Sequence, residues 1–382
     1  MKKLLCVLLM LAFLSGCTLS TQPENQGTDK NITAVWIFFD ELSMKDLQGG
    51  TGDEYRERID KMFDNCVSRG VNTVFFHVRP YGDAFYKSEI FPWTAYLTGK
   101  QGQGVDYDPL QIALDSAHAR GLTLHAWINP FRIAVKEDIS LLSEDNPALK
   151  WIKSKSPDVV NINKGYYYSP ASINAQKLIT DGVREIVKRY DVDGIHIDDY
   201  FYPSTDKCVD EYYYKAYKKS GGGMKLSEWR RNNISALVSQ LYKATKSRNE
   251  NCIFSVSPQG NIRNNYDGQF ADVRLWMKEE GYADWIIPQV YYGFENEFLP
   301  FDNACDAWAE MKKCESVKLI FGLAPYKINN GEDEWEEDAG IMEKQLGYIY
   351  SKKNCCGAAF FSYKSIVNND FPLTVSLELP AK

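Results

Sequence analysis

Two adjacent carboxylates, Asp198 and Asp199, follow a short apolar run and precede three aromatic residues. The segment reads Asp-Gly-Ile-His-Ile-Asp-Asp-Tyr-Phe-Tyr-Pro from position 193 to position 203. Glycoside hydrolysis usually needs two carboxyl groups, and aromatic rings offer flat apolar faces that suit sugar rings. The pattern therefore predicts a glycosidase site at the carboxyl end of a strand. The alternative is a strand-ending turn in which both carboxylates only cap the next segment.

The partner carboxylate of Asp198 has several candidates. Side chains alternate along a strand, so His196 and Tyr200 should share the face of Asp198, which would line a barrel. Asp199 should leave that face. We take Asp198 as one catalytic carboxyl and either Asp199 or Asp83 as the other, although Asp83 could be a turn residue and Asp199 a buried partner of an arginine or helix. Four further acids remain possible from other loops: Asp40, Glu41, Asp267 and Glu295.

Three of the four histidines, His77, His125 and His196, lie in consecutive predicted strands. A zinc site would need three or four ligands at one depth and an open position. No HExxH or CxxC spacing accompanies these histidines. We therefore expect them to bind sugar hydroxyls or to orient Asp198, and we expect neither a metal nor a cofactor.

Polar and aromatic residues at the other strand ends are hard to explain as core, because a barrel interior prefers branched apolar side chains. Arg79 and Asn129 could fix hydroxyl or N-acetyl oxygens by directed hydrogen bonds. Further rings that could stack on sugars are Tyr167, Tyr168, Tyr202 and Tyr292. The predicted substrate-binding residues are His77, Arg79, Trp127, Asn129, His196, Tyr200, Gln289 and Tyr291.

Eight short runs rich in Val, Ile and Phe alternate with helical patterns, which predicts an α/β fold, a (β/α)8 TIM barrel. The predicted strands are 34–39, 73–78, 123–128, 194–198, 253–257, 285–290, 318–323 and 358–362. The clearest predicted helices are 55–69, 109–120, 174–190, 227–247, 305–314 and 338–352. A doubly wound open sheet is the alternative, but no phosphate-binding glycine motif follows any of these strands.

Long segments follow the third and fourth predicted strands, at 131–168 and 201–226. They fall on the face where barrel loops build active sites. Only twenty residues follow Ser362, so the eighth helix should be short or missing.

The N-terminus predicts export. Lys2 and Lys3 precede an apolar run too short to span a bilayer, and 14–17 (Leu-Ser-Gly-Cys) resembles the lipobox of bacterial lipoproteins. This predicts a signal peptide at 1–16, a lipid on Cys17, a flexible tether at 17–32, a barrel at 33–370 and a tail at 371–382. The protein would then be extracytoplasmic and anchored to a membrane. An ordinary signal peptide is the alternative.

The net charge of −7 disfavours a nucleic-acid partner, because such domains usually present a basic face. Nine cysteines suggest a disulfide framework at first. Cys6 lies in the signal and Cys17 is the lipid site, so seven remain, without metal-ligand spacing. A bridge between Cys305 and Cys314 is possible.

Several ordered motifs resemble the glycosyl-hydrolase-like 10 family over about 33–363. They are 79–86, 92–93, 97–99, 107–110, 125–130, 193–203, 257–258 and 288–291. The resemblance implies a TIM barrel, often in a bacterial lipoprotein, with glycoside hydrolase activity. One branch of the family is associated with cell-wall glycan, particularly strands stripped of their peptides.

The 193–203 segment also resembles the chitinase pattern DGxDxDxE, but Tyr200 stands at the position of the acid Glu and His196 replaces an Asp. An amylase-like DGxRxD pattern would make Asp198 the nucleophile, yet Ser257 and Pro258 stand where its strand-five Glu would be. The expected function is thus hydrolysis of an extracytoplasmic polysaccharide, the glycan of peptidoglycan. The alternatives are a carbohydrate-binding lipoprotein without catalysis and a metal-dependent deacetylase.

Overall fold

The computed structural model describes residues 32–328, 330 and 333–374. Eight parallel strands close into a barrel in the order β1-β11-β10-β9-β8-β7-β3-β2. Their bounds are β1 Ile32–Ile37, β2 Thr73–Arg79, β3 Thr123–Ile128, β7 Gly194–Ile197, β8 Ile253–Val256, β9 Trp285–Ile286, β10 Lys318–Leu323 and β11 Cys355–Phe361. The predicted TIM barrel is confirmed, and the doubly wound sheet is excluded because β1 pairs with both β2 and β11.

The sixth barrel strand is shorter than predicted. Regular pairing in β9 stops at Ile286, where the sequence suggested a strand over 285–290. Pro288 has no backbone N–H to donate to a neighbouring strand, which interrupts the ladder. Beyond it, Gln289 makes only isolated parallel bridges to Gln259 and Gly322. This irregular stretch brings Gln289 to the barrel mouth.

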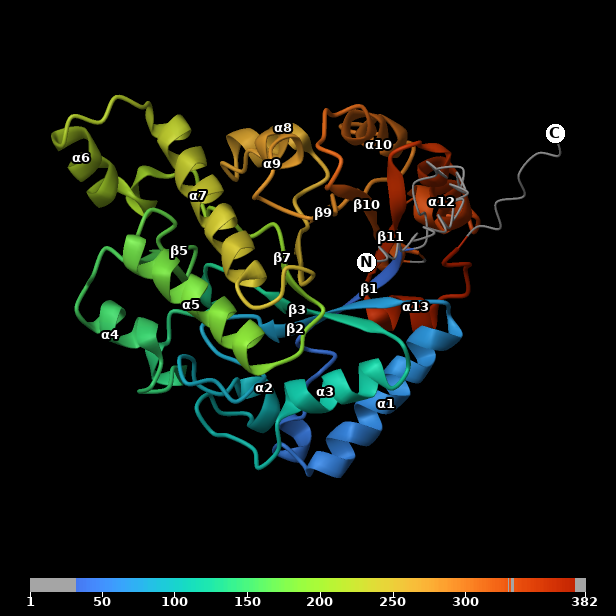
Figure 1. The fold of residues 1–382 in the computed structure, drawn as a ribbon, viewed down its shortest axis with the longest axis horizontal. Coiled ribbons are helices and arrows are strands. Elements are labelled where there is room, and N and C mark those ends of the chain that lie inside the picture. Colours follow the sequence, from blue (N-terminus) through green and yellow to red (C-terminus); the bar gives the residue numbers. More distant parts are fainter. Residues whose placement is uncertain (1–31, 329, 331–332, 375–382) are drawn as a thin grey trace, which may run out of the picture.

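Helices cover the outside of the barrel (Figure 1). The longer ones are α1 Gly52–Ser68, α3 Pro109–His118, α5 Ile173–Arg189, α7 Leu226–Lys246, α10 Phe301–Ala309 and α12 Ile341–Ser351. Shorter ones are α2 Ala95–Thr98, α8 Ile262–Asp267, α9 Val273–Lys278, α11 Asp333–Glu337 and α13 Tyr363–Asn368. As expected, the last is only six residues long. Gly70 and Gly121 adopt positive φ after α1 and α3, a conformation that favours glycine at helix ends.

Two buried clusters hold these layers together. The larger lies between the barrel and its helices. The smaller fills the barrel and contains Trp36, Phe75, Trp127 and Trp285. His125 and His196 are buried among these rings. The interior is therefore aromatic and polar rather than the branched aliphatic stack usual in such barrels.

Both long segments after the third and fourth barrel strands carry structure of their own. The first contains η2 Ile139–Leu141, α4 Pro147–Lys153 and a small sheet of β4 Arg132–Ala134, β6 Gly165–Tyr168 and β5 Val159–Ile162 in that order. The second contains η3 Lys207–Val209 and α6 Glu211–Lys219, and α6 stands at the edge of the molecule (Figure 1). Two more 3₁₀ turns, η1 Lys45–Leu47 and η4 Pro325–Lys327, follow β1 and β10.

The predicted signal peptide, Cys17 and all but the last residue of the predicted tether lie outside the described residues. At the other end, Phe371 and Leu373 of the predicted tail are buried against the barrel, and Arg69 Nη2 donates to Phe371 O at 2.6 Å. The suggested bridge between Cys305 and Cys314 is not formed, because both thiols are free. In the described part of the chain, no helix is long and apolar enough to cross a membrane.

Candidate functional site

A cavity of about 220 Å³ opens at the carboxyl ends of the barrel strands. Seven predicted site residues line it, namely His77, Trp127, Asp198, Asp199, Tyr200, Gln289 and Tyr291. Its other lining residues are Trp36, Phe38, Phe39, Arg132, Ser257, Tyr326 and Phe361. Among the described residues, Asp198 and Asp199 are the only carboxylates of this mouth cavity.

Asp198 is buried and held by neutral donors. Trp127 Nε1 donates to Asp198 Oδ2 at 3.0 Å, and Asn129 Nδ2 lies 3.3 and 3.2 Å from the two carboxylate oxygens. The backbone N–H of Tyr200 lies 3.5 Å from Oδ1. These contacts fix the direction of the carboxyl group without neutralising its charge.

Burial raises the pKa of Asp198 to about 7, and the neighbouring charge of Asp199 acts in the same direction. The Trp127 hydrogen bond and the Arg132 guanidinium oppose this rise. A carboxyl group with such a pKa can hold a proton near neutral pH and donate it to a leaving group. The environment therefore suits a general acid better than the nucleophile that the amylase-like pattern suggested.

Asp199 faces the same cavity, contrary to the alternation argument. β7 ends at Ile197, so the period of two no longer governs the direction of the side chains that follow. Gln289 Nε2 donates to Asp199 Oδ1 at 3.3 Å, and Gln259 is a further hydrogen-bond partner. Burial raises the pKa of Asp199, and these two amides oppose the rise. The structure thus brings the two adjacent carboxyl groups into one site.

Asp83 does not reach the mouth cavity. It lines a separate groove, where Gln101 Nε2 donates to its Oδ2 at 3.2 Å, and burial raises its pKa to about 6. Glu41 accepts hydrogen bonds from Phe38 N and Ser362 Oγ and so joins the loops after β1 and β11. The remaining three candidates also lie outside the lining of the mouth cavity: Asp40, Asp267 and Glu295.

Three predicted substrate-binding residues lie beneath the cavity instead of lining it. The Arg79 guanidinium is buried, contacts the carbonyls of Tyr81 and Pro130 at 3.4 Å, and lies 4.8 Å from the centre of the Phe91 ring. Asn129 is fully buried, and its Oδ1 accepts the backbone N–H of Arg132. Neither side chain lines the cavity, because strand position does not show how deeply loops will cover a side chain.

His196 is the third of these residues. Trp36 Nε1 donates to His196 Nε2 at 2.9 Å, and His196 Nδ1 lies 2.8 Å from Ser255 Oγ. An indole nitrogen can only donate, so Nε2 must accept and the proton resides on Nδ1. Burial holds the pKa of His196 well below its ordinary value, which keeps the ring neutral. His196 therefore supports the cavity from below.

His77 does line the cavity, and its ring stacks on Trp127 with 3.6 Å between centroids. Both of its ring nitrogens are buried and have no hydrogen-bond partner among the described residues. His125, in contrast, points to Ser255 Oγ in the barrel interior at 3.4 Å. In the described part of the chain, no group of three His, Cys, Asp or Glu side chains could hold a metal ion. The three-histidine site that the deacetylase alternative requires is thus not assembled.

Arg132 is a site residue that the sequence reasoning missed. Its guanidinium lies 4.6 Å from the Tyr200 ring centre and 5.1 Å from that of Tyr81, and it favours the charged forms of Asp198 and Asp199. It comes three residues after Asn129, just beyond the 125–130 motif. From the sequence, only an extension of that motif to position 132 would have pointed to Arg132.

Residues 31–337 match the sequence pattern of the family described as Glycosyl hydrolase-like 10. This chain belongs to that family. It is 34% identical over 374 residues to the glycosyl hydrolase YngK of Bacillus subtilis, covering 92% of this chain and 72% of that protein. It is 35% identical over 322 residues to the glycosyl hydrolase DigH of Escherichia coli, covering 75% of this chain and 71% of that protein.

Solved structures of similar fold include carbohydrate-active enzymes. The PgaB (BpsB) glycoside hydrolase domain of Bordetella bronchiseptica superposes with a TM-score of 0.60 at 13% identity, over 88% of this chain and 95% of that one. Alpha-L-fucosidase isoenzyme 2 of Paenibacillus thiaminolyticus gives 0.55 at 14% identity, over 88% of this chain and 48% of that one. At these identities the likeness shows the shared barrel fold alone.

Proposed function

We propose that this member of the family hydrolyses glycosidic bonds in an extracytoplasmic polysaccharide, the glycan strands of peptidoglycan, with Asp198 as proton donor and Asp199 as its charged partner. The observation that carries the chemistry is the pair of buried carboxyl groups in one cavity at the barrel mouth. Family membership and the barrel support a glycosidase role.

The environments of the two carboxyl groups suit them to different roles in the reaction. Asp198, whose pKa is near 7, donates its proton to the glycosidic oxygen as the bond to the leaving sugar breaks. Asp199, held by two glutamine amides, supplies negative charge to the oxocarbenium-like transition state or directs the attack of water. Because like charges in one cavity repel, the favoured arrangement has the proton on Asp198 and the charge on Asp199.

The remaining walls suit a sugar ring. Tyr291, Tyr326 and Phe361 lie with ring centroids 6.0 to 6.3 Å apart and form an aromatic wall of the cavity. A sugar hydroxyl, directly or through one water, would give the His77 nitrogens the partner they lack. Tyr200 and Gln289 complete the expected contacts.

The substrate and location rest on the sequence. The resemblance to the cell-wall branch of the family favours peptide-free glycan strands. The lipobox-like segment 14–17 favours a lipid on Cys17, which would hold the barrel outside the cytoplasm near the cell wall. Replacing Cys17 by alanine should release the protein from membranes and remove acyl mass from the purified chain.

The test is incubation of the purified protein with peptide-free peptidoglycan strands, followed by mass spectrometry of the products. Shorter chains with intact acetyl groups support hydrolysis. Binding to strands without any shortening would reject the proposal in favour of a carbohydrate-binding lipoprotein. Full-length chains that lose the mass of acetyl groups would identify a deacetylase.

A further inference from the structure

A second, larger hollow lies beside the mouth cavity, between the loops that follow β2 and β3. Its volume is about 1030 Å³, against about 220 Å³ for the mouth cavity. Tyr81 and Tyr96 form part of one side, and Val135 and Leu141 part of the other. We call this hollow the loop groove.

Aromatic rings connect the loop groove to the mouth cavity. Phe39 lines the mouth cavity, and its ring centroid lies 4.6 Å from that of Tyr96 and 5.5 Å from that of Tyr81. Arg132 also lines the mouth cavity and contacts the rings of Tyr81 in the groove and Tyr200 at the mouth. A chain leaving the carboxyl pair can therefore follow a strip of rings into the groove.

The rings in the groove suit sugars. Tyr81 and Tyr96 are nearly parallel, with an interplanar angle of 16° and centroids 6.3 Å apart. Tyr96 remains partly accessible, whereas Tyr81 is 9% exposed. Such rings offer apolar faces together with polar hydroxyls, the combination that pyranose rings require.

The charges in the groove select among glycans. Lys45 lies 5.8 Å from the centre of the Tyr96 ring, and Lys100 and Lys136 are exposed along the same groove. On the acidic side, Asp138 is exposed and accepts hydrogen bonds from Ser140 N and Oγ, Glu144 is paired with Lys153 at 2.9 Å, and the Asp83 carboxylate is buried. The three lysines therefore outnumber the exposed carboxylates that have no paired cation. A groove with this balance should repel sugars that carry free amines and accept neutral or acidic ones.

We infer that the loop groove binds the part of the glycan chain that extends beyond the bond at Asp198, and that it takes N-acetylated or acidic sugars rather than amino sugars. This inference rests on the proposed function, because it assumes that the bond is broken at the mouth. The protein would then recognise several consecutive sugars and act on polymers far better than on disaccharides.

The experiment measures binding by calorimetry with full-length protein carrying Asp198→Asn, which prevents turnover. The probes are peptide-free glycan strands of two, four and eight sugars and an octamer of glucosamine. Affinity should rise with strand length and should be weak for the glucosamine octamer. Adding Tyr96→Ala should lower the affinity for eight sugars roughly ten-fold, as expected for one anchoring ring, and leave the disaccharide unchanged.

Tyr96→Ala removes a ring that packs on Phe39 of the mouth cavity. A second variant therefore tests the groove with this contact left intact. Leu141 is 57% exposed, so Leu141→Trp should fold normally while filling the groove, and it should cause the same length-dependent loss. The matched control is Tyr212→Ala, because Tyr212 is 65% exposed on α6 and lies outside the groove. It should bind every probe as the parent does.

The outcomes separate the two proposals. Equal affinity for all strand lengths, or tight binding of the glucosamine octamer, would overturn the groove assignment even if native protein cleaves the strands. Length-dependent binding lost in Tyr96→Ala, but without cleavage by native protein, would support the groove and reject the hydrolase.

Discussion

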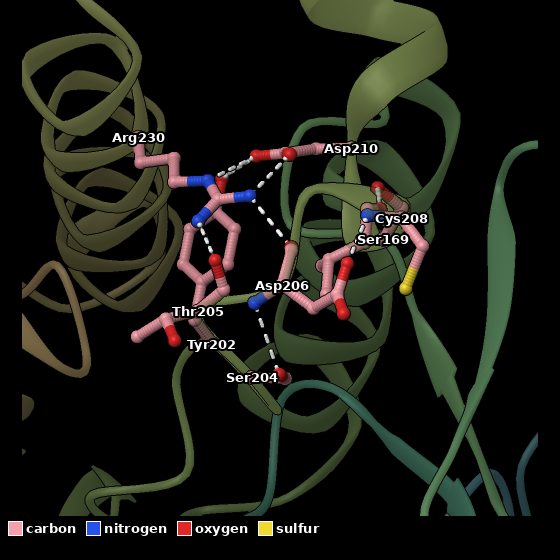
Figure 2. Close-up of polar contacts among 9 residues, drawn as sticks. Ser169, Tyr202, Ser204, Thr205, Asp206, Cys208, Asp210 and Arg230 are labelled. Atoms are coloured by element: carbon pink, nitrogen blue, oxygen red, sulfur yellow. Dashed lines mark hydrogen bonds and ion pairs between the residues drawn. The ribbon is translucent and has the colours of Figure 1, made fainter.

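Two buried carboxylates in the segment that follows β7 behave in opposite ways. Asp210 is 2% exposed and is paired with Arg230, whose Nη2 and Nε lie 2.6 and 2.7 Å from its two oxygens (Figure 2). Arg230 also donates to the carbonyls of Thr205 and Asp206 at 2.8 Å. Asp198 is 3% exposed, yet its bonded partners are an indole, an amide and a backbone N–H.

This difference in partners distinguishes a structural carboxylate from a chemically active one. A carboxylate held by two nitrogens of a buried guanidinium fastens the chain around it. Here that pair ties the segment after Tyr202 to α7, with the guanidinium carbon 5.2 and 4.9 Å from the ring centres of Tyr202 and Phe270. A buried carboxyl without a paired cation gains and loses its proton in the working pH range, as catalysis requires.

The largest expected effect is the loss of turnover in Asp198→Asn. The amide keeps the shape of the side chain but cannot donate the proton, so hydrolysis of glycan strands should fall by about 10²- to 10⁴-fold while binding persists. Product release measured by mass spectrometry tests this, with circular dichroism to show folding. Near-normal turnover by a folded variant would assign the acid to another group.

Breaking the other pair should cost stability. Arg230→Ala leaves Asp210 buried and uncompensated, so the free energy of unfolding should fall by about 3 to 5 kcal/mol. Urea unfolding at neutral pH measures it. The control is Arg231→Ala, whose guanidinium stacks on Tyr266 at 3.9 Å and should contribute less than about 1 kcal/mol. Equal losses in the two variants would contradict the structural role assigned to Asp210.

Asp198→Asn should have the opposite effect on stability. The folded pKa of Asp198 is raised to about 7, well above that of an unfolded Asp, so the native state binds the proton more tightly. The free energy of unfolding of the parent protein therefore falls as pH rises from about 4 to 7 and Asp198 loses its proton. The Asn variant should be more stable than the parent at pH 8 by up to about 4 kcal/mol, since the pKa is raised by about three units, and the gain should shrink at pH 4. A variant less stable than the parent at pH 8 would show that the partners of Asp198 stabilise its carboxylate, as Arg230 stabilises that of Asp210.

The smallest expected effect is a shift in the pH profile. As a general acid, Asp198 must be protonated, so kcat/KM should decline as pH rises through about 7. Trp127 donates a hydrogen bond that lowers the pKa of Asp198, so Trp127→Phe should move this decline to higher pH, by less than about one unit. Tyr291→Phe is the control, because its hydroxyl makes no hydrogen bond to Asp198. An unchanged profile in Trp127→Phe would indicate that another group sets the decline.

The sequence alone was enough to predict the barrel and to single out the two carboxylates that line its mouth cavity. Eight β-branched and aromatic runs between amphipathic helices predict a closed parallel sheet, and the 193–203 motif marks the strand end that carries the carboxylates. These features are local, because apolar periodicity and turn residues report on a few neighbouring positions at a time. The lipobox-like segment belongs to the same class and remains a prediction.

Only the tertiary structure decided which polar residues meet. Asp199 turns into the cavity because β7 ends two residues before it, and Asp83 lies in the loop groove although its motif belongs to the family pattern. Arg79, Asn129 and His196 became supports because neighbouring loops and rings cover them completely. Arg132 entered the site from the start of β4 and lines the same cavity as Asp198. How deeply a side chain is buried, and where it points beyond a strand end, depend on packing between distant segments. The spacing of residues along the sequence does not record that packing.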